Sequence, residues 1–441
     1  MLNQSRFPRY NKFSPKAPVF QVSNSQKPTI HRFFDSSPVS PSGKYITLTE
    51  FNDDTSLPSL GDFSFVIVID LESGKEVYRK KTYAWDTQLG AQAQWGAKDE
   101  ELFFNDMDIK YWRPYGVKVN IFTRVEYTLK GTIYMVSPDG KISLTPCLKK
   151  IGYIQKGYGV NVPISEVELK PGLSESDGVF IIDNSTGNKQ LLLNIKQITS
   201  AIFTEKELSK MEKGYFFCFH LKWNPQGTKI MLVLRWLNNI GTKKSKNFLI
   251  TFNSDGSNIK LAVSPKRWGL GHHPNWCPDG ENIIMNLTFN DYRFIVPSVI
   301  NFCERVARKL GVMVYTNAQA LRLSMFSFEG GAFNNISGKY YGSGHPTFNE
   351  KGGYSLTDSY PSERVAFSDG TVPIRAIKLG GSREDTVIRI ATKPSYNGPK
   401  GEWRIDPHPA WSNNYRYIVF NAAPDGIRQV FIADMKGYDL K

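Results

Sequence analysis

The stretch His273-Pro-Asn-Trp276-Cys-Pro-Asp-Gly280 recurs in outline along the second half of the chain. In each copy a histidine stands three residues before an aromatic residue, and a turn or turn-like sequence follows. The other copies are His220-Leu-Lys-Trp223-Asn-Pro-Gln-Gly227, His345-Pro-Thr-Phe348-Asn-Glu-Lys-Gly352 and His408-Pro-Ala-Trp411-Ser-Asn-Asn-Tyr415. Repeats place equivalent positions on one face of a fold, so the pattern predicts that these histidines meet around a common centre.

Seven similar units, each a turn followed by an apolar strand, run along the chain. Their turns begin at Ser40, Gly96, Ser137, Asn224, Cys277, Asn349 and Ser412. Most units continue with a second apolar strand that ends in a polar turn, such as Val66-Ile-Val-Ile-Asp-Leu-Glu-Ser-Gly74. Proline, aspartate and glycine favour tight turns, and β-branched runs favour strands. This rhythm is typical of four-stranded propeller blades.

We therefore predict an all-β fold, a seven-bladed β-propeller of four-stranded antiparallel blades. Residues 29–441 form its single domain, and residues 1–28 form an extended N-terminal arm because they are rich in Pro, Ser, Lys and Asn without periodicity. A β-sandwich does not account for so many similar units. Helical insertions are expected near Phe203–Lys213 and Val299–Leu310.

The charge balance is strongly basic. Lys and Arg number 55 against 41 Asp and Glu, a net charge of +14. Such a surface favours polyanions, although scattered basic residues also suit an ordinary solvated surface. The chain has no arginine-rich arm, zinc-finger spacing or RNA-binding signature. We therefore expect an acidic polysaccharide partner and no nucleic acid.

The four cysteines lie far apart, without a CxxC pair, so free thiols are expected in place of a disulfide framework. The N-terminus shows no apolar signal region. No apolar run approaches the roughly 18 residues that a membrane-spanning helix needs. We expect a cytoplasmic, monomeric protein without a transmembrane segment.

In a propeller, the residue just before the inner strand of a blade lies at one end of the central channel. This slot is occupied in units four to seven by His220, His273, His345 and His408. Gln92 takes the slot in the second unit, while the first unit has His31 upstream and Asp35 nearer the slot. Imidazoles with a carboxylate could hold a divalent cation. The alternative is that each histidine only bonds the backbone of a neighbouring blade.

The repeats resemble those of the oligogalacturonate lyases, seven-bladed propeller enzymes that cleave uronate oligosaccharides by β-elimination with a divalent metal, usually manganese. The resemblance covers roughly residues 215–440. His220 with Trp223 resembles a Gly-His-Pro blade start of that family. The stretch from His273 to Gly280 resembles Thr-His-Glu-Phe-Trp-x-Pro-Asp-Gly, whose histidine is the catalytic base. Ser343-Gly-His345 resembles a Ser-His pair whose histidine binds the metal.

The last blade carries both the best match and the main departures. Asn421-Ala-Ala-Pro-Asp-Gly426 matches the family's closing blade. Trp403-Arg-Ile-Asp406-Pro-His408 resembles Gln-x-x-His-Pro-His, which supplies three metal ligands, but Asp406 replaces the first histidine and Trp403 the glutamine. Asp still binds a hard cation. The resemblance therefore implies a site of His345, Asp406 and His408 for manganese, with zinc or calcium as alternatives.

β-Elimination beside a uronate needs its carboxylate neutralised, a base to take the C5 proton, and an acid for the leaving oxygen. The family's catalytic arginine has no clean counterpart, so Lys246 and Arg235 are the candidates to assist the metal. His273 is the expected base. The acid would be a tyrosine, His220 or His272.

The segment Thr357-Asp358-Ser359-Tyr360-Pro361 could add a side chain to the rim of the site, although such a segment is more often an ordinary strand end.

We expect a metal-assisted lyase for acidic glycans. The alternatives are a non-catalytic TolB-like propeller that binds a protein or polyanion, and a hydrolase. The chain lacks a GxSxG elbow and a P-loop.

Overall fold

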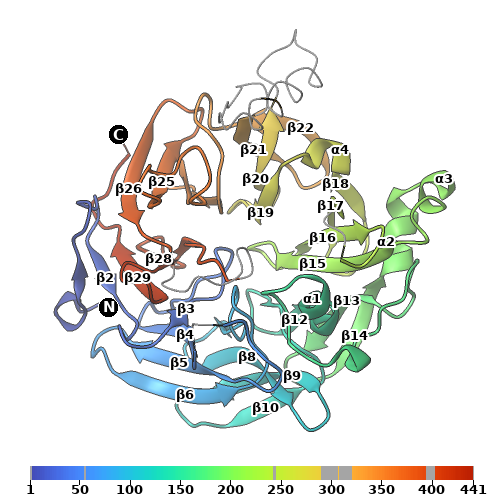
Figure 1. Cartoon of the computed structure of the whole chain (residues 1–441), viewed down its shortest axis with the longest axis horizontal. Coiled ribbons are helices and arrows are strands. Elements are labelled where there is room, and N and C mark those ends of the chain that lie inside the picture. The colour runs from blue at the N-terminus through green and yellow to red at the C-terminus, as the bar shows by residue number, and fades with distance from the viewer. Residues whose placement is uncertain are drawn as a thin grey trace.

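The computed structural model describes residues 2–53, 56–241, 245–289, 306, 320–393 and 403–440. Within these residues, the strands form seven small antiparallel sheets that stand in a ring around a central axis (Figure 1). Each sheet is one blade, with its first strand nearest the axis. The predicted all-β, seven-bladed propeller is confirmed.

The first four blades follow the chain in order. Blade 1 consists of β3 (Thr29–Ile30), β4 (Tyr45–Phe51), β5 (Ser64–Asp70) and β6 (Glu76–Thr82). Blade 2 consists of β7 (Gln94–Trp95), β8 (Glu101–Asp108), β9 (Arg113–Asn120) and β10 (Glu126–Leu129). Blade 3 consists of β11 (Met135–Val136), β12 (Ile142–Thr145), β13 (Gly178–Asp183) and β14 (Lys189–Asn194). Blade 4 consists of β15 (Tyr215–Trp223), β16 (Lys229–Leu237), β17 (Ser245–Asn253) and β18 (Lys260–Val263).

The last three blades complete the ring. Blade 5 consists of β19 (His272–Trp276), β20 (Asn282–Phe289), β21 (Ala320–Ser327) and β22 (Gly330–Asn335). Blade 6 consists of β23 (Thr347–Asn349), β24 (Tyr354–Thr357), β25 (Val372–Lys378) and β26 (Glu384–Ile390). Blade 7 consists of β27 (Ala410–Trp411), β28 (Tyr417–Ala422) and β29 (Gln429–Asp434), joined by β2 (Val19–Gln21) and β1 (Arg9–Tyr10).

The predicted turns join the first and second strands of the blades. In blade 3, Gly140 takes a left-handed φ of 75°, and its N–H donates to the carbonyl of Ser137 at 2.8 Å. The Asp139 carboxylate accepts the N–H of Lys141 at 3.1 Å. Aspartate followed by glycine suits this turn because glycine reaches positive φ without a steric penalty.

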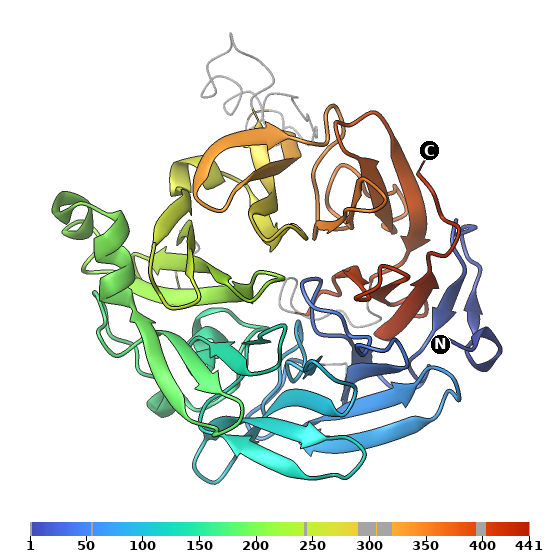
Figure 2. The same ribbon diagram turned by 180° about the vertical axis from the view of Figure 1, so that it is seen from behind.

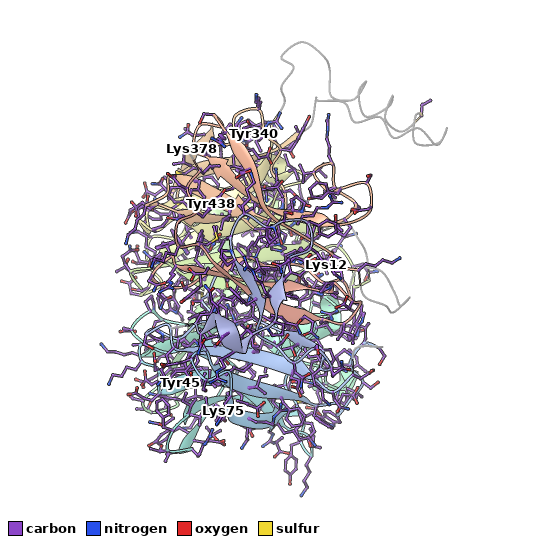
Figure 3. The ribbon with its side chains drawn as sticks, turned by 90° about the vertical axis from the view of Figure 1, so that its left-hand side faces the viewer. Lys12, Tyr45, Lys75, Tyr340, Lys378 and Tyr438 are labelled. Atoms are coloured by element: carbon purple, nitrogen blue, oxygen red, sulfur yellow. The ribbon has the colours of Figure 1, made fainter. Side chains whose placement is uncertain are left out.

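The two ends of the chain close the ring together. β2 pairs antiparallel with β29, with Val19 opposite Ala433 and Phe20 opposite Ile432. The N-terminal strands lie beside the C-terminal blade in both ring views (Figures 1 and 2). On this side of the molecule lie Lys12 and Tyr438 (Figure 3), whose side chains bond Asp425 and Asp385. The segment expected as an extended N-terminal arm thus supplies two strands to blade 7, while a domain boundary at residue 28 stays a prediction.

Few helices interrupt the strands of the described residues. They are α1 (Leu148–Ile154), α2 (Ile195–Ile202), α3 (Glu205–Leu208) and α4 (Pro265–Trp268), with 3-10 turns at Gln4–Arg6 and Ile164–Glu166. The predicted insertion at Phe203–Lys213 contains only α3. The longer helix α2 begins earlier because Asn194 caps it, accepting the N–H of Gln197 at 2.7 Å. The predicted insertion at Val299–Leu310 lies outside the described residues, apart from Val306.

Two further expectations concern cysteines and membranes. Cys147, Cys218 and Cys277 are free thiols, and Cys303 lies outside the described residues. Across the described part of the chain, no helix combines the length and apolar character needed to cross a bilayer.

Candidate metal and catalytic site

The slot residues share an unusual backbone conformation. A left-handed φ between 48° and 58° is found at Gln92, His220, His273 and His408. In blades 4 and 5 the strand register also shifts around the slot, between Phe219 and Lys222 and between His272 and Asn275. A β-bulge re-aims a side chain, and left-handed backbone at a non-glycine residue is uncommon. The recurrence shows that the slot is a structural equivalence and not only a sequence pattern.

In blade 6 the left-handed conformation falls one residue before the histidine. Gly344 takes the left-handed conformation there, with φ of 55°, and His345 follows it. A Cβ on Gly344 would lie 2.0 Å from the Asp358 carboxylate, so glycine is required at this position. The side chain of His345 is thereby delivered to Asp358.

His345, Asp406 and His408 form a compact buried cluster. One ligand atom from each lies within 4.8 Å of the others. Their residues are only 1%, 3% and 1% exposed. Nε2 of His408 lies 3.7 Å from Oδ2 of Asp406. Two imidazoles and a carboxylate are a donor set that suits a divalent transition metal.

The surroundings of the cluster fit a bound cation. Nδ1 of His345 lies 3.0 Å from both carboxylate oxygens of Asp358. Asp358 also accepts the backbone N–H groups of His345 and His408. Holding the proton on Nδ1 leaves Nε2 as a free ligand atom, an arrangement common behind metal-binding histidines. Both ring nitrogens of the buried His408 lack a hydrogen-bond partner among the described residues, and a metal would satisfy one of them.

His273 stacks on His345 and is presented as a neutral base. Nδ1 of His273 lies 2.8 Å from the carbonyl oxygen of Gly344, which can only accept, so Nδ1 carries the proton. Its Nε2 is therefore unprotonated and lies 3.3 Å from the hydroxyl of Tyr360. Burial, followed by the neighbouring His345 and His272, holds the pKa of His273 well below its usual value.

Behind the base, a line of polar groups leads toward solvent. Nδ1 of His272 lies 2.9 Å from Nδ1 of His273 and accepts a hydrogen bond from the amide of Asn286 at 3.4 Å. His272 therefore carries its proton on Nε2, which faces a carboxylate oxygen of Glu363 at 3.8 Å. Burial lowers the pKa of His272 to about 4 and raises the pKa of Glu363. This line can carry a proton away from His273.

His220 belongs to the same ring of imidazoles. Its Nδ1 lies 2.7 Å from the hydroxyl of Tyr134, and its ring stacks on Phe33 with centroids 5.2 Å apart. Phe33 also contacts His408 and His345, at centroid distances of 4.6 and 5.7 Å. His220 therefore borders the cluster through an aromatic side chain.

Phe33 and Phe34 fill the centre of the ring from the loop after β3. The residues around them form a buried network of charges, in which Asp35 pairs with Arg32 at 2.7 Å and with Lys222 at 3.1 Å. The ammonium of Lys222 lies 4.2 Å from the ring centroid of Phe34. Asp35, expected near the histidine slot, thus binds two cations beside this aromatic plug.

A pocket of about 500 Å³ opens where Phe34, Asp35 and Lys222 face the turns of the blades. Around it stand the aromatic residues of the repeats, which are Trp95, Trp223, Trp276, Phe348 and Trp411. The members of the metal cluster do not line this pocket. The plug therefore stands between the metal cluster and a separate pocket.

The two basic candidates lie at different depths. Arg235, on β16, donates to Gln155 at 2.9 Å and lies over the ring of Phe219, next to His220. Burial lowers its pKa to about 10, and its Nε has no hydrogen-bond partner among the described residues. Lys246, on the third strand of blade 4, is exposed and lies over the Trp236 ring. The structure thus places Arg235, and not Lys246, beside the histidines.

Several residues of this site were not singled out from the sequence. Arg404 donates from Nε to Asp406 at 2.8 Å and from Nη2 to the hydroxyl of Tyr158 at 3.1 Å. Arg404 stands two residues before a predicted ligand, which is a usable signal. Tyr158 and Phe33 carry no such signal because they come from loops between strands. Asp358 and Tyr360, weighed as minor rim residues, contact His345 and His273 directly.

Comparison with known proteins places the fold. No family model and no curated protein matches the chain. The solved structure of an oligogalacturonate lyase in complex with manganese is similar, with a TM-score of 0.61 and 13% identity over 97% of this chain and 96% of that chain. An oligogalacturonate lyase from Vibrio parahaemolyticus gives 0.60 and 12% over the same shares. At this identity the likeness shows the propeller fold alone.

Proposed function

We propose that this protein is a metal-assisted lyase that cleaves uronate-containing acidic oligosaccharides by β-elimination. The observation that carries the proposal is the unprotonated Nε2 of His273, held in one tautomer by Gly344 and stacked on His345. A neutral base beside a buried cluster of metal-binding type is the arrangement that abstraction of a proton next to a carboxylate requires. The manganese-bound lyase with a similar fold supports it.

The chain offers a residue for each step. A divalent cation, expected to be manganese, held by His345, Asp406 and His408 would act as a Lewis acid on the uronate carboxylate. Arg235 adds a cation close to the ring of histidines, and its Nε–H has no hydrogen-bond partner in the described part of the chain. Neutralising the carboxylate in this way acidifies the C5 proton of the sugar.

Proton transfer then follows from the hydrogen bonds of the site. Nε2 of His273 takes the C5 proton, the electron pair of that bond forms a C4–C5 double bond, and the C4–O bond breaks. Tyr360 gives its proton to the leaving oxygen, because burial raises its pKa well above its usual value and keeps it protonated. Nε2 of His273 then returns a proton to the Tyr360 oxygen, 3.3 Å away, which restores both groups for the next cycle.

The test is a direct assay of the purified protein with manganese on oligosaccharides of galacturonate, glucuronate and mannuronate. β-Elimination yields an unsaturated uronate that absorbs in the ultraviolet, whereas hydrolysis yields reducing ends without that absorbance. We expect the absorbance to rise with at least one substrate and to be lost in His273→Gln. Cleavage without the absorbance would identify a hydrolase and contradict the proposal.

A second candidate is a non-catalytic propeller that binds a protein or polyanion. The observation that favours it is the pocket of about 500 Å³ on the far side of the plug, which is separate from the cluster. Asn275→Asp at its lining would weaken binding of an anion there and leave the histidines unchanged. A partner lost on this substitution, in a protein that turns over none of the uronates, would select this candidate.

A further inference from the structure

The carboxylate of Asp406 faces both Arg404 and the candidate metal cluster through one oxygen atom. Oδ2 accepts the Nε–H of Arg404 at 2.8 Å, and the same Oδ2 lies 3.7 Å from Nε2 of His408, within the candidate metal cluster. The Asp406 side chain is 2% exposed, whereas that of Arg404 is 33% exposed. The acid is therefore fixed inside the site, while the guanidinium stands between the site and solvent.

We infer that Arg404 competes with the metal for Asp406, and that an acidic ligand which engages Arg404 strengthens metal binding. A divalent cation on Oδ2 shares its lone pairs with Arg404 and is repelled by the guanidinium charge. In the absence of metal, the same guanidinium neutralises a buried carboxylate that would otherwise be costly. Arg404 is thus a substitute cation for the unloaded site.

Besides its bond to Asp406, the Arg404 guanidinium contacts two tyrosines. Its Nη2 bonds the hydroxyl of Tyr158 at 3.1 Å, and its guanidinium carbon lies 5.8 Å from the ring centroid of Tyr360. Tyr360 contacts His273, and Tyr158 contacts His220. A carboxylate that arrives beside them would meet Arg404 in the planar, two-pronged geometry that guanidinium groups favour.

Metal and acidic ligand are then coupled. A carboxylate that binds Arg404 draws the guanidinium away from Asp406. The full negative charge of the Asp406 carboxylate is then available to the metal. Linkage requires the reverse effect to be equal, so bound metal strengthens the acidic ligand by the same factor. The metal half of the inference needs only the cluster, while the ligand half rests on the proposed function, because it takes a uronate as the acid.

The experiment measures manganese binding to metal-free protein by electron paramagnetic resonance of the free ion. Arg404→Gln keeps a hydrogen-bond donor but removes the charge, and we expect it to bind manganese about tenfold more tightly than the natural protein. Arg416→Gln is the matched control. It removes a similar pair, in which Arg416 is 28% and Asp434 6% exposed, on the same blade. We expect less than about a twofold change there.

The outcomes separate the inference from the proposed function. Equal or weaker manganese binding by Arg404→Gln, with binding abolished in His408→Ala, would overturn the inference and leave the metal site intact. Absence of manganese binding in every variant would overturn both. Addition of D-galacturonate should strengthen manganese binding more in the natural protein than in Arg404→Gln. An equal gain in the two proteins would show that the sugar acts without Arg404.

Discussion

The imidazole rings of His273 and His345 stack face to face, with centroids 3.8 Å apart and planes 28° apart, although they come from different blades. The contact joins the candidate base to the candidate metal cluster. One side of His345 is bound by Asp358, and its ring face is covered by His273. A substitution of Asp358, His345 or His273 should therefore alter the position of the other two side chains.

Removal of the candidate base should strongly lower turnover without loss of the fold. His273→Gln is expected to lower the rate of β-elimination by about 10²–10⁴-fold, the range of a positioned general base. Manganese binding should persist, because the ligands remain. His272→Gln keeps the base and removes only the next group in line, so its loss should be smaller. The rate of rise of ultraviolet absorbance measures both. A larger loss in His272→Gln would move the role of base to His272.

The orientation of His345 should control metal affinity. Asp358→Asn weakens the partner that holds the proton on Nδ1 of His345. We expect about 10–100-fold weaker manganese binding, the usual effect of losing such a partner. His220→Asn, a histidine of the same ring outside the cluster, serves as the control and should bind manganese normally. Isothermal titration of metal-free protein gives the affinities, and unchanged binding by Asp358→Asn would remove Asp358 from the metal site.

The two basic candidates can be separated by steady-state kinetics on an oligouronate. Arg235→Gln should lower kcat/KM by about 10²-fold, because the loss of a charged partner inside a site costs roughly 2–4 kcal/mol. Lys246→Gln should change kcat/KM by less than about twofold, since an exposed charge contributes little. A large effect of Lys246→Gln with none at Arg235 would restore Lys246 as the carboxylate partner.

Closure of the ring should contribute strongly to stability. Phe20 lies on β2 and is 3% exposed, so Phe20→Ala is expected to lower the free energy of unfolding by about 3 kcal/mol. Phe13 lies in the same N-terminal segment but is 46% exposed. Phe13→Ala should cost less than about 1 kcal/mol. Denaturant unfolding measures both. Equal effects would mean that β2 is not needed to hold blade 7.

Stability should fall as the solution is acidified below neutral pH. His31 is fully buried, and burial lowers its pKa to about 4, whereas the unfolded chain titrates near the ordinary value of about 6.5. Between these values the unfolded state binds more protons, so the free energy of unfolding drops with falling pH. His31 alone should remove about 2 kcal/mol between pH 6.5 and pH 5. Unfolding of His31→Gln should show a shallower pH slope, and an unchanged slope would exclude His31 as the source.

The fold was predictable because its signal repeats. Turn residues such as Asp139 and Gly140 occur before the second strand of one blade after another, so local chemistry alone marks the units. The shared slot of His220, His273 and His408 was also predictable from the sequence. Residues at the same place in each repeat take equivalent places around the axis of a circular fold. The left-handed φ at these histidines was not predictable, because histidine as a residue type does not indicate that conformation.

The contacts across the axis could not be read from the sequence. Phe33 and Asp35 come from blade 1 but contact side chains of blades 4, 6 and 7. These residues are far apart in the sequence, and only closure of the ring brings them together. Asp35 was expected beside the histidines because it lies near the slot in sequence; it pairs with Arg32 and Lys222 and is not one of the three cluster residues. The choice between Arg235 and Lys246 likewise depended on strand position, because Arg235 lies on β16 next to His220 whereas Lys246 lies exposed on β17.

The joining of the first and last strands has a consequence for the order of events during biosynthesis. β2 leaves the ribosome before the strands of blades 1 to 6, but its partner β29 follows all of them in the chain. The nascent chain must carry an unpaired edge, and an aromatic loop without its histidine neighbours, until blade 7 has been synthesised. The cluster of His345, Asp406 and His408 can therefore assemble only after the seventh blade has been synthesised.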